Sequence, residues 1–202
     1  HQITDKVKKK ICEIYNNGVK FILTSARMPT SVHSFLNQLE IKSPYVCYSG
    51  SMILGEDREV LRSAGIPLTI AKDICDCIKD KYSDIVCTTY YKDEWIASET
   101  DNRWVQQEKE ITGMDIIQAE LPDIKELTGE VNKLMCMGEA DEIEAAEKDL
   151  RDLYPELLIY RSKDTYLEII SGSASKSSAV RFLCDKLSVP IDKSVSLGDS
   201  YN

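Results

Sequence analysis

The fold class follows from the stretch Lys193-Ser194-Val195-Ser196-Leu197-Gly198-Asp199-Ser200-Tyr201-Asn202. Val195 to Leu197 is predicted to form a short buried strand, and Gly198-Asp199 follows where that strand ends. A carboxylate directly after a strand lies at the carboxyl edge of an open α/β sheet, where such sheets bind ligands. The stretch therefore predicts an α/β protein with a polar site at one edge of its sheet.

Two more segments place polar groups at the ends of predicted elements. Phe21-Ile22-Leu23-Thr24-Ser25-Ala26-Arg27 reads as a strand that ends in hydroxyls, and Lys176 stands before a predicted helix. A hydroxyl, an ammonium group and a carboxylate at one edge form a site for a phosphate and a hard metal ion. Taken singly, each has an ordinary explanation: Ser25 as a strand-end cap, Lys176 as a solvated side chain and Asp199 as a turn residue.

Composition limits the class of protein. The chain has 202 residues, of which 43% are hydrophobic, enough for one large domain or two small ones. Its net charge of −9 argues against a nucleic-acid partner, because nucleic-acid affinity depends on basic patches. No apolar run approaches the roughly 20 residues of a membrane helix, so we also expect no membrane partner.

Cysteine and histidine usage narrows the chemistry further. Seven cysteines with no CxxC pair indicate reduced, mostly buried thiols of a cytoplasmic protein. Cys75-x-Cys77 is interpreted as two ordinary helix residues rather than a metal pair. His1 and His33 are the two histidines, too few for most mechanisms based on Ser-His, Cys-His or histidine-bound zinc. If the protein is an enzyme, we expect carboxylates as its acids and bases.

Helix and strand patterns alternate at the start of the chain. Thr4 caps a predicted helix that stops at Asn17-Gly18, and Val19 to Leu23 is a predicted strand. Pro29 to Leu39 then predicts a second helix, and Tyr45 to Tyr48 a second strand. This rhythm is typical of a parallel sheet with right-handed crossovers.

The pattern changes in the middle of the chain, where hairpin signals appear. Lys92-Asp93 separates two predicted strands, and Ser98-Glu99-Thr100-Asp101 resembles a capping box that opens a helix. Val131 to Met137 predicts a strand, and Ala140 to Leu153 an acidic amphipathic helix. Helix–strand alternation returns near Ser173. We therefore predict a discontinuous core, residues 1–62 and 171–202, around an inserted α+β domain, residues 63–170.

In this order, the motifs resemble the haloacid dehalogenase (HAD) superfamily of phosphatases, and more closely its Cof-type (type IIB) branch, which is similar to sugar phosphatases. The resemblance covers nearly the whole chain. It rests on residues 21–27, on Tyr48-Ser49-Gly50-Ser51, on Leu167-Glu168-Ile169 with Lys176, and on Gly198-Asp199-Ser200-Tyr201-Asn202. It implies a Rossmann-like core, with a parallel sheet flanked by helices, and an inserted α+β cap domain.

The resemblance also implies a role for each matching residue. Ser25 matches the hydroxyl that hydrogen-bonds the transferring phosphoryl group. Lys176 matches the lysine that neutralises the charge of the nucleophile and the phosphate. Asp199 matches a carboxylate that holds Mg²⁺, a hard ion that prefers oxygen ligands. The residues expected to bind substrate are Arg27, Ser49, Gly50 and Asn202.

The chain departs from the family pattern at two places. The family's nucleophile is an aspartate in an Asp-x-Asp-Gly-Thr run, which these 202 residues do not contain. The branch usually has Asn-Gly-Ala where Ser49-Gly50-Ser51 stands here. We expect a chain cut at both ends, and therefore a polypeptide that by itself hydrolyses nothing.

For the parent protein, the resemblance implies a Mg²⁺-dependent phosphatase that acts through an aspartyl-phosphate. Its substrate is expected to be a small phosphorylated metabolite, with a sugar phosphate as first choice. The protein is expected to be a monomer or a weak homo-oligomer. The alternative is a non-catalytic phosphate- or ligand-binding protein, and a phosphotransferase is a third reading. In the inserted domain, Tyr90, Tyr91, Trp95 and Arg103 are candidates for substrate contact, with packing of the hairpin as the competing explanation for the aromatic residues.

Overall fold

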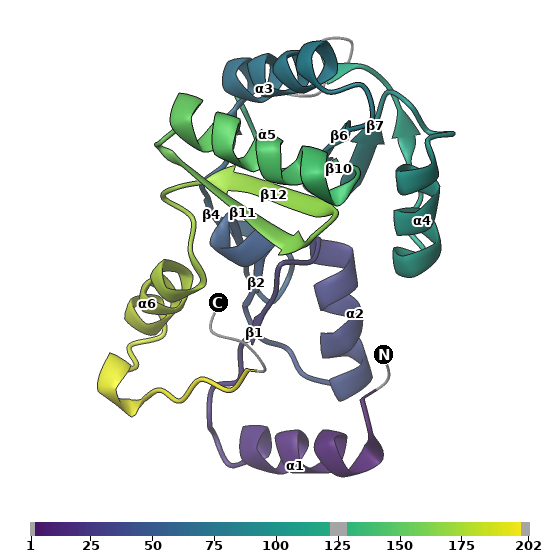
Figure 1. Cartoon of the computed structure of the whole chain (residues 1–202). Coiled ribbons are helices and arrows are strands. Elements are labelled where there is room, and N and C mark those ends of the chain that lie inside the picture. Colours follow the sequence, from purple (N-terminus) through teal and green to yellow (C-terminus); the bar gives the residue numbers. More distant parts are fainter. Residues whose placement is uncertain (1–2, 122–128, 199–202) are drawn as a thin grey trace. The chain divides into compact units, whose positions relative to one another are not determined.

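The structure is a computed structural model that describes residues 3–121 and 129–198. It divides into two compact units (Figure 1): unit 1 contains His1–Ser63 and Ala174–Asn202, and unit 2 contains Ala64–Ser173. Both units combine helices with sheet, so the predicted α/β class is confirmed. Within the described ranges, every helix is too short or too polar to cross a membrane.

Unit 1 is built on a four-stranded sheet in the order β1-β2-β3-β4. β1 and β2 are parallel, as the predicted crossover through a helix requires, whereas the pairs β2–β3 and β3–β4 are antiparallel. The strands are β1 (Leu23–Thr24), β2 (Tyr45–Cys47), β3 (Met52–Leu54) and β4 (Val60–Ser63). A short 3-10 turn, η1 (Tyr48–Gly50), joins β2 to β3.

The helices predicted near the start of the chain are confirmed. α1 (Asp5–Asn16) follows Thr4, and α2 (Pro29–Leu39) begins at the predicted proline. Proline suits the first turn of a helix because its missing N–H has no intrahelical partner there. Val32 and Leu36 of α2 are buried. Their spacing of four residues puts them on one face of the helix, which is why the sequence pattern found it.

Helices cover both faces of the unit 1 sheet. α6 (Lys176–Lys186) shares an apolar cluster with the sheet through Leu183 and Val46. α2 contacts the neighbouring strand residue, since the rings of His33 and Tyr45 lie with their centroids 5.8 Å apart. Adjacent residues of a strand point to opposite faces. The sheet therefore lies between α2 and α6, which gives unit 1 three layers.

Two predicted strands of unit 1 need correction. Of Val19 to Leu23, only Leu23 belongs to a strand, as the start of β1. The strand predicted at Val195 to Leu197 does not form: these residues follow η3 (Ile191–Lys193), and Val195 and Leu197 are 85% and 95% exposed. A strand needs a neighbour for its backbone N–H and C=O groups. None of the described strands pairs with residues 195–197.

Unit 2 contains a six-stranded sheet in the order β11-β12-β10-β6-β7-β8 and a separate pair, β5–β9. Its strand pairs are antiparallel except for the parallel pair β7–β8. The strands are β5 (Ile66–Pro67), β6 (Val86–Tyr91), β7 (Glu94–Ala97), β8 (Ile117–Gln118), β9 (Glu130–Val131), β10 (Lys133–Met137), β11 (Leu157–Lys163) and β12 (Tyr166–Ser171). The single strand predicted at Val131 to Met137 is interrupted at Asn132, which separates β9 from β10.

The core of unit 2 lies under two helices. α3 (Leu68–Lys81) and α5 (Ala140–Leu153) lie over one face of the six-stranded sheet (Figure 1). Ile74 of α3 and Ile143 of α5 belong to the same buried cluster as Leu134 of β10. Burying one such side chain contributes about 1.5–3 kcal/mol. This cluster therefore fastens both helices to the sheet.

The third helix of unit 2, α4 (Arg103–Thr112), begins later than predicted. The predicted capping box at residues 98–101 does not cap it. Its N-cap is Asn102, whose side-chain oxygen accepts a hydrogen bond from the Trp104 backbone N–H at 3.0 Å. The helix ends at Gly113, as predicted. Asparagine and serine are comparable N-caps, so the two possible starts compete in the sequence.

We predict that Asn102→Ala lowers the free energy of unfolding by about 1 kcal/mol, because the Trp104 N–H loses its acceptor. Urea unfolding followed by circular dichroism measures this. Ser98→Ala is the matched control, and its effect should stay below about 0.5 kcal/mol. Equal losses from both variants would contradict the assignment of Asn102 as the cap.

Candidate functional site

The segment after β1 is bonded to the segment after β2 through backbone groups. The Ser25 N–H donates to the Val46 carbonyl at 3.0 Å, and the Ser49 N–H donates to the Ser25 carbonyl at 3.0 Å. The Tyr48 N–H donates to the Arg27 carbonyl at 3.2 Å. Ser25 and Ser49 are thereby held next to each other at the carboxyl end of the parallel pair β1–β2.

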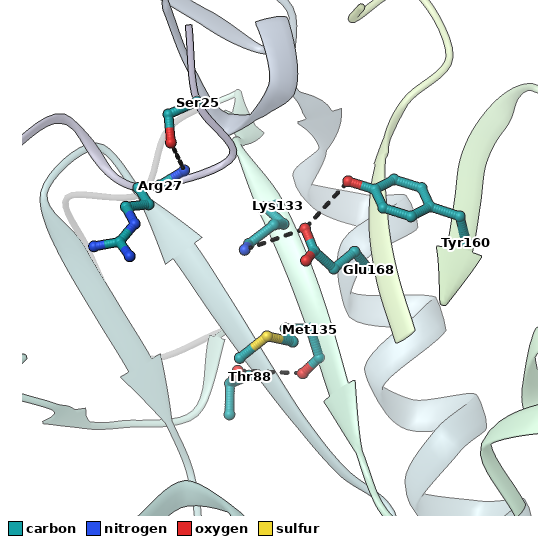
Figure 2. A network of polar contacts seen from close by, with 7 residues as sticks. All are labelled: Ser25, Arg27, Thr88, Lys133, Met135, Tyr160 and Glu168. Carbon is teal, nitrogen blue, oxygen red and sulfur yellow. Dashed lines mark hydrogen bonds and ion pairs between the residues drawn. The ribbon is translucent and has the colours of Figure 1, made fainter. Parts of the chain in front are cut away.

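The Ser25 side chain is held by its own turn. Its Oγ accepts a hydrogen bond from the Arg27 backbone N–H at 3.2 Å (Figure 2). This contact uses a lone pair of the hydroxyl, so the hydroxyl proton can be donated to an anion. The Arg27 side chain is exposed, with its guanidinium carbon 5.7 Å from the centre of the Phe35 ring. Ser25 itself is half-buried.

The turn after β2 has an unfavourable backbone conformation. Tyr48 and Ser49 have φ angles of 49° and 55°, and Gly50 has φ 109°. Residues other than glycine lose about 1–2 kcal/mol in the left-handed region. Such conformations persist where the surrounding structure enforces them, and they gather at functional sites. The turn is therefore a candidate ligand-binding segment.

Gly50 brings this turn against the start of α6. A Cβ on Gly50 would lie 2.3 Å from the carbonyl oxygen of Ser175, so glycine alone permits this approach of the two backbones. Ser175 caps α6, because its Oγ accepts a hydrogen bond from the Ser178 N–H at 3.0 Å. Lys176 is the first residue of α6 and is half-buried. The turn that carries Ser49 thus lies against the helix end that carries Lys176.

This arrangement gathers donors for an anion. The start of α6 presents backbone N–H groups and the positive end of the helix dipole. The ammonium group of Lys176 adds a full positive charge at the same helix end, and the hydroxyls of Ser25 and Ser49 belong to the bonded turns beside it. Donors of this kind favour a ligand with several anionic oxygens, such as a phosphate group.

The structure does not describe the remaining two residues that the sequence singled out. Asp199 and Asn202 lie outside the described residues. Within residues 3–121 and 129–198, no group of three or more His, Cys, Asp or Glu side chains is arranged to hold a metal ion. The metal-binding part of the prediction therefore stays a prediction.

Unit 2 contains a buried ion pair that the sequence analysis did not identify. Lys133 Nζ lies 3.4 Å from Glu168 Oε2, and the Tyr160 hydroxyl donates to the same oxygen at 3.2 Å (Figure 2). The side chains of Lys133 and Glu168 are 9% and 11% exposed. Lys133 Nζ also lies 4.5 Å from the centre of the Tyr90 ring. The signal in the sequence was a lysine directly before the apolar run at residues 134–137.

The aromatic candidates of the inserted domain are used for packing. The rings of Tyr90 and Trp95 stack at 5.9 Å and both side chains are buried. Arg103 is exposed and pairs with Glu139 at 2.5 Å. Lys92 Nζ lies 4.8 Å above the Tyr91 ring. For the three aromatic residues, packing is therefore favoured over substrate contact.

Near the ion pair, burial also raises the pKa of two titratable groups. Burial raises the pKa of Tyr166 to about 12, and the Gln107 side chain donates to its hydroxyl oxygen at 3.1 Å. Burial likewise raises the pKa of the Glu108 carboxyl. The Tyr166 hydroxyl therefore keeps its proton at neutral pH.

Comparison with known proteins gives the family. The model of the haloacid dehalogenase-like hydrolases matches residues 1–202. A protein of Haemophilus influenzae, provisionally named a phosphatase, is 31% identical over 204 residues, which cover 100% of this chain and 75% of that protein. The chain belongs to the haloacid dehalogenase-like hydrolases, as the order of its motifs predicted.

Solved structures confirm the fold. A haloacid dehalogenase-like hydrolase from Bacteroides thetaiotaomicron matches with a TM-score of 0.87 and 20% identity, over 99% of this chain and 76% of that chain. A structure described as a HAD subclass IIB sugar phosphatase matches with a TM-score of 0.76 and 14% identity, over 96% of this chain and 72% of that chain. At these identities the similarity is one of fold.

We predict that Gly50→Ala lowers the free energy of unfolding by about 2–4 kcal/mol, through its φ angle and the contact with Ser175. Gly113→Ala is the control, because Gly113 also has a positive φ, 67°, but a Cβ there would meet nothing within 4 Å. Its loss should be about 1 kcal/mol. Denaturant unfolding compares the two, and equal losses would rule out a special close approach at Gly50.

We further predict that Lys133→Met lowers the free energy of unfolding by about 3 kcal/mol, because it leaves Glu168 buried without its cation. The double variant Lys133→Met, Glu168→Gln removes the charge and keeps an acceptor for Tyr160. It should be more stable than the single variant. A double variant that is less stable than Lys133→Met would contradict the pairing.

Proposed function

We propose that the protein containing this chain is a Mg²⁺-dependent phosphatase that acts on a small phosphorylated metabolite, with a sugar phosphate as the substrate class. Membership of the hydrolase family and the phosphatase name of the relative from Haemophilus influenzae support the reaction. The structural similarity to a protein described as a sugar phosphatase supports the substrate class.

The observation that carries the proposal is the close approach of the Ser49-Gly50 turn to the start of α6. Together with the backbone bond between Ser25 and Ser49, it gathers two hydroxyls, a helix N-terminus and an ammonium group in unit 1. In phosphoryl transfer, catalysis is mostly positioning and charge stabilisation. These groups suit both tasks.

Each residue then has a stated part in the proposed reaction. The Ser25 hydroxyl donates to an oxygen of the phosphoryl group and orients it. The ammonium group of Lys176 stabilises negative charge on the phosphoryl oxygens as the bond to the leaving group breaks. Ser49 and the backbone at Gly50 border the phosphate site, and Asn202 orients the phosphate or a metal ligand. Arg27, at the mouth of the site, meets the rest of the substrate.

The metal ion enters the proposal through Asp199. Carboxylate oxygens are the ligands that Mg²⁺ prefers, and a bound ion would withdraw charge from the phosphate. These 202 residues contain no Asp-x-Asp-Gly-Thr run. By themselves they are therefore proposed to bind phosphate without hydrolysing it.

We also propose that unit 1 is the catalytic core and unit 2 the cap domain that selects the substrate. The unit boundaries, after Ser63 and before Ala174, lie close to the division predicted from the sequence and support it. Closure of a cap excludes water from the reacting groups.

A cytoplasmic location is supported by the seven cysteines, all of which are free thiols. We further propose that the protein is a monomer or a weak homo-oligomer.

The test uses the complete product of the gene that encodes this chain. With Mg²⁺, it should release phosphate from at least one member of a sugar phosphate panel, and a chelator should stop the release. Lys176→Ala should lower kcat about 10²–10³-fold, the usual loss when one stabilising donor is removed. Lys186→Ala is the matched control, because Lys186 is exposed in the last turn of the same helix.

Two outcomes would contradict the proposal. Equal activity of the Lys176→Ala and Lys186→Ala variants would remove Lys176 from the site. Binding of inorganic phosphate without release from any substrate would favour the non-catalytic binding protein.

A further inference from the structure

Unit 2 brings together three cysteines that the proposed function does not use. Cys75 lies on α3, Cys87 on β6 and Cys136 on β10. The Sγ atoms of Cys75 and Cys87 are 3.2 Å apart. Cys87 and Cys136 stand opposite each other in the register of β6 and β10. A helix and the sheet beneath it thus meet at two thiols that are already in contact.

A small cleft gives access to this pair. It is lined by Cys75 and Cys87, together with polar and apolar residues that include Lys72, Asp76 and Thr89. Its volume is about 40 Å³, and both thiols are half-buried. A space of this size holds a water molecule or a molecule little larger. Hydrogen peroxide, which is little larger than water, fits it.

The local environment keeps both thiols protonated. The hydrogen bond with Cys87, followed by burial, raises the pKa of the Cys75 thiol well above its usual value. The hydrogen bond with Cys136 does the same to the pKa of Cys87. Since the thiolate is the reactive form, each thiol alone is a slow nucleophile. The contact between the two sulfur atoms is therefore the feature that favours their reaction with each other.

We propose that Cys75 and Cys87 are a site of reversible oxidative modification, at which a peroxide closes a disulfide between α3 and β6. In the first step one sulfur attacks a peroxide oxygen, the O–O bond breaks, and a sulfenic acid and water form. In the second step the other sulfur attacks the sulfenic sulfur, the S–O bond breaks, and the S–S bond forms with release of a second water. The two sulfur atoms lose two electrons in total, and the peroxide accepts them.

The geometry selects this pair among the neighbouring cysteines. A disulfide bond is about 2.05 Å long, so the sulfur atoms at 3.2 Å have a short distance to close. Directly opposed strand residues such as Cys87 and Cys136 have Cβ atoms about 4.5–5.5 Å apart, longer than the roughly 3.8 Å of a disulfide. Cys77 is two residues from Cys75 on the same helix, and residues at that spacing do not share a face.

The test treats the complete chain with hydrogen peroxide, blocks the remaining thiols with an alkylating agent, and maps its peptides by mass spectrometry without reduction. We expect one cross-linked peptide pair, Cys75 with Cys87, loss of two of the seven free thiols, and reversal by dithiothreitol. The oxidised chain should unfold at a higher temperature, because the disulfide restricts the unfolded chain. The Cys77→Ser variant should form the same bond, and the Cys75→Ser variant should not.

The proposal is overturned if the peroxide-treated wild-type chain contains a Cys87–Cys136 disulfide, a disulfide between chains, or over-oxidised thiols without a Cys75–Cys87 link. It is also overturned if Cys77→Ser abolishes the bond in a chain with an unchanged circular dichroism spectrum. The map of the wild-type chain decides the matter by itself, so the result does not depend on the folding of a variant.

Discussion

The geometry of unit 1 depends on the close approach of two backbones, at Gly50 and Ser175. These residues lie far apart in the sequence, and a single added carbon at Gly50 would overlap the Ser175 carbonyl. The contact fixes the turn after β2 against the start of α6. Through the bond between Ser25 and Ser49, it also fixes the end of β1. Because Gly50 has no side chain, these three separate segments of the chain can stay in contact.

This arrangement has an energetic cost that the rest of unit 1 must offset. Tyr48 and Ser49 both adopt left-handed backbone angles, at about 1–2 kcal/mol each. Burial of the Tyr48 ring, which is 1% exposed, works in the opposite direction. Unit 2 contains a comparable compromise, since the Lys133–Glu168 pair occupies a buried position where apolar residues would often be as stable. In both units, stability has been given up for a defined placement of polar groups.

The helices could be predicted from local sequence patterns. The strands and the polar contacts could be predicted less well, because they depend on residues far apart in the sequence. α2 and α5 follow from the spacing of apolar residues, which is a property of the helix alone. A strand depends on its neighbours, and for that reason Val195 to Leu197 was predicted as a strand although no described strand pairs with it. The order of motifs predicted Ser25 and Lys176 as site residues, although their segments meet only through contacts between distant parts of the chain. The ion pair between Lys133 and Glu168 joins residues 35 positions apart, and no local pattern reveals such a contact.

Asn132 has a mechanical consequence for unit 2. Its N–H donates to the Tyr90 carbonyl at 2.9 Å, and its side-chain oxygen accepts from the Lys92 N–H at 2.8 Å. On one side of it β9 pairs with β5, near the point where the chain enters unit 2, and on the other side β10 occupies an inner position of the large sheet. A pull on the entering chain is therefore transmitted through β9 and Asn132 to an inner strand, where hydrogen bonds on both edges resist it. The segment that enters unit 2 is thus connected to β10, which is hydrogen-bonded to a neighbouring strand on each side.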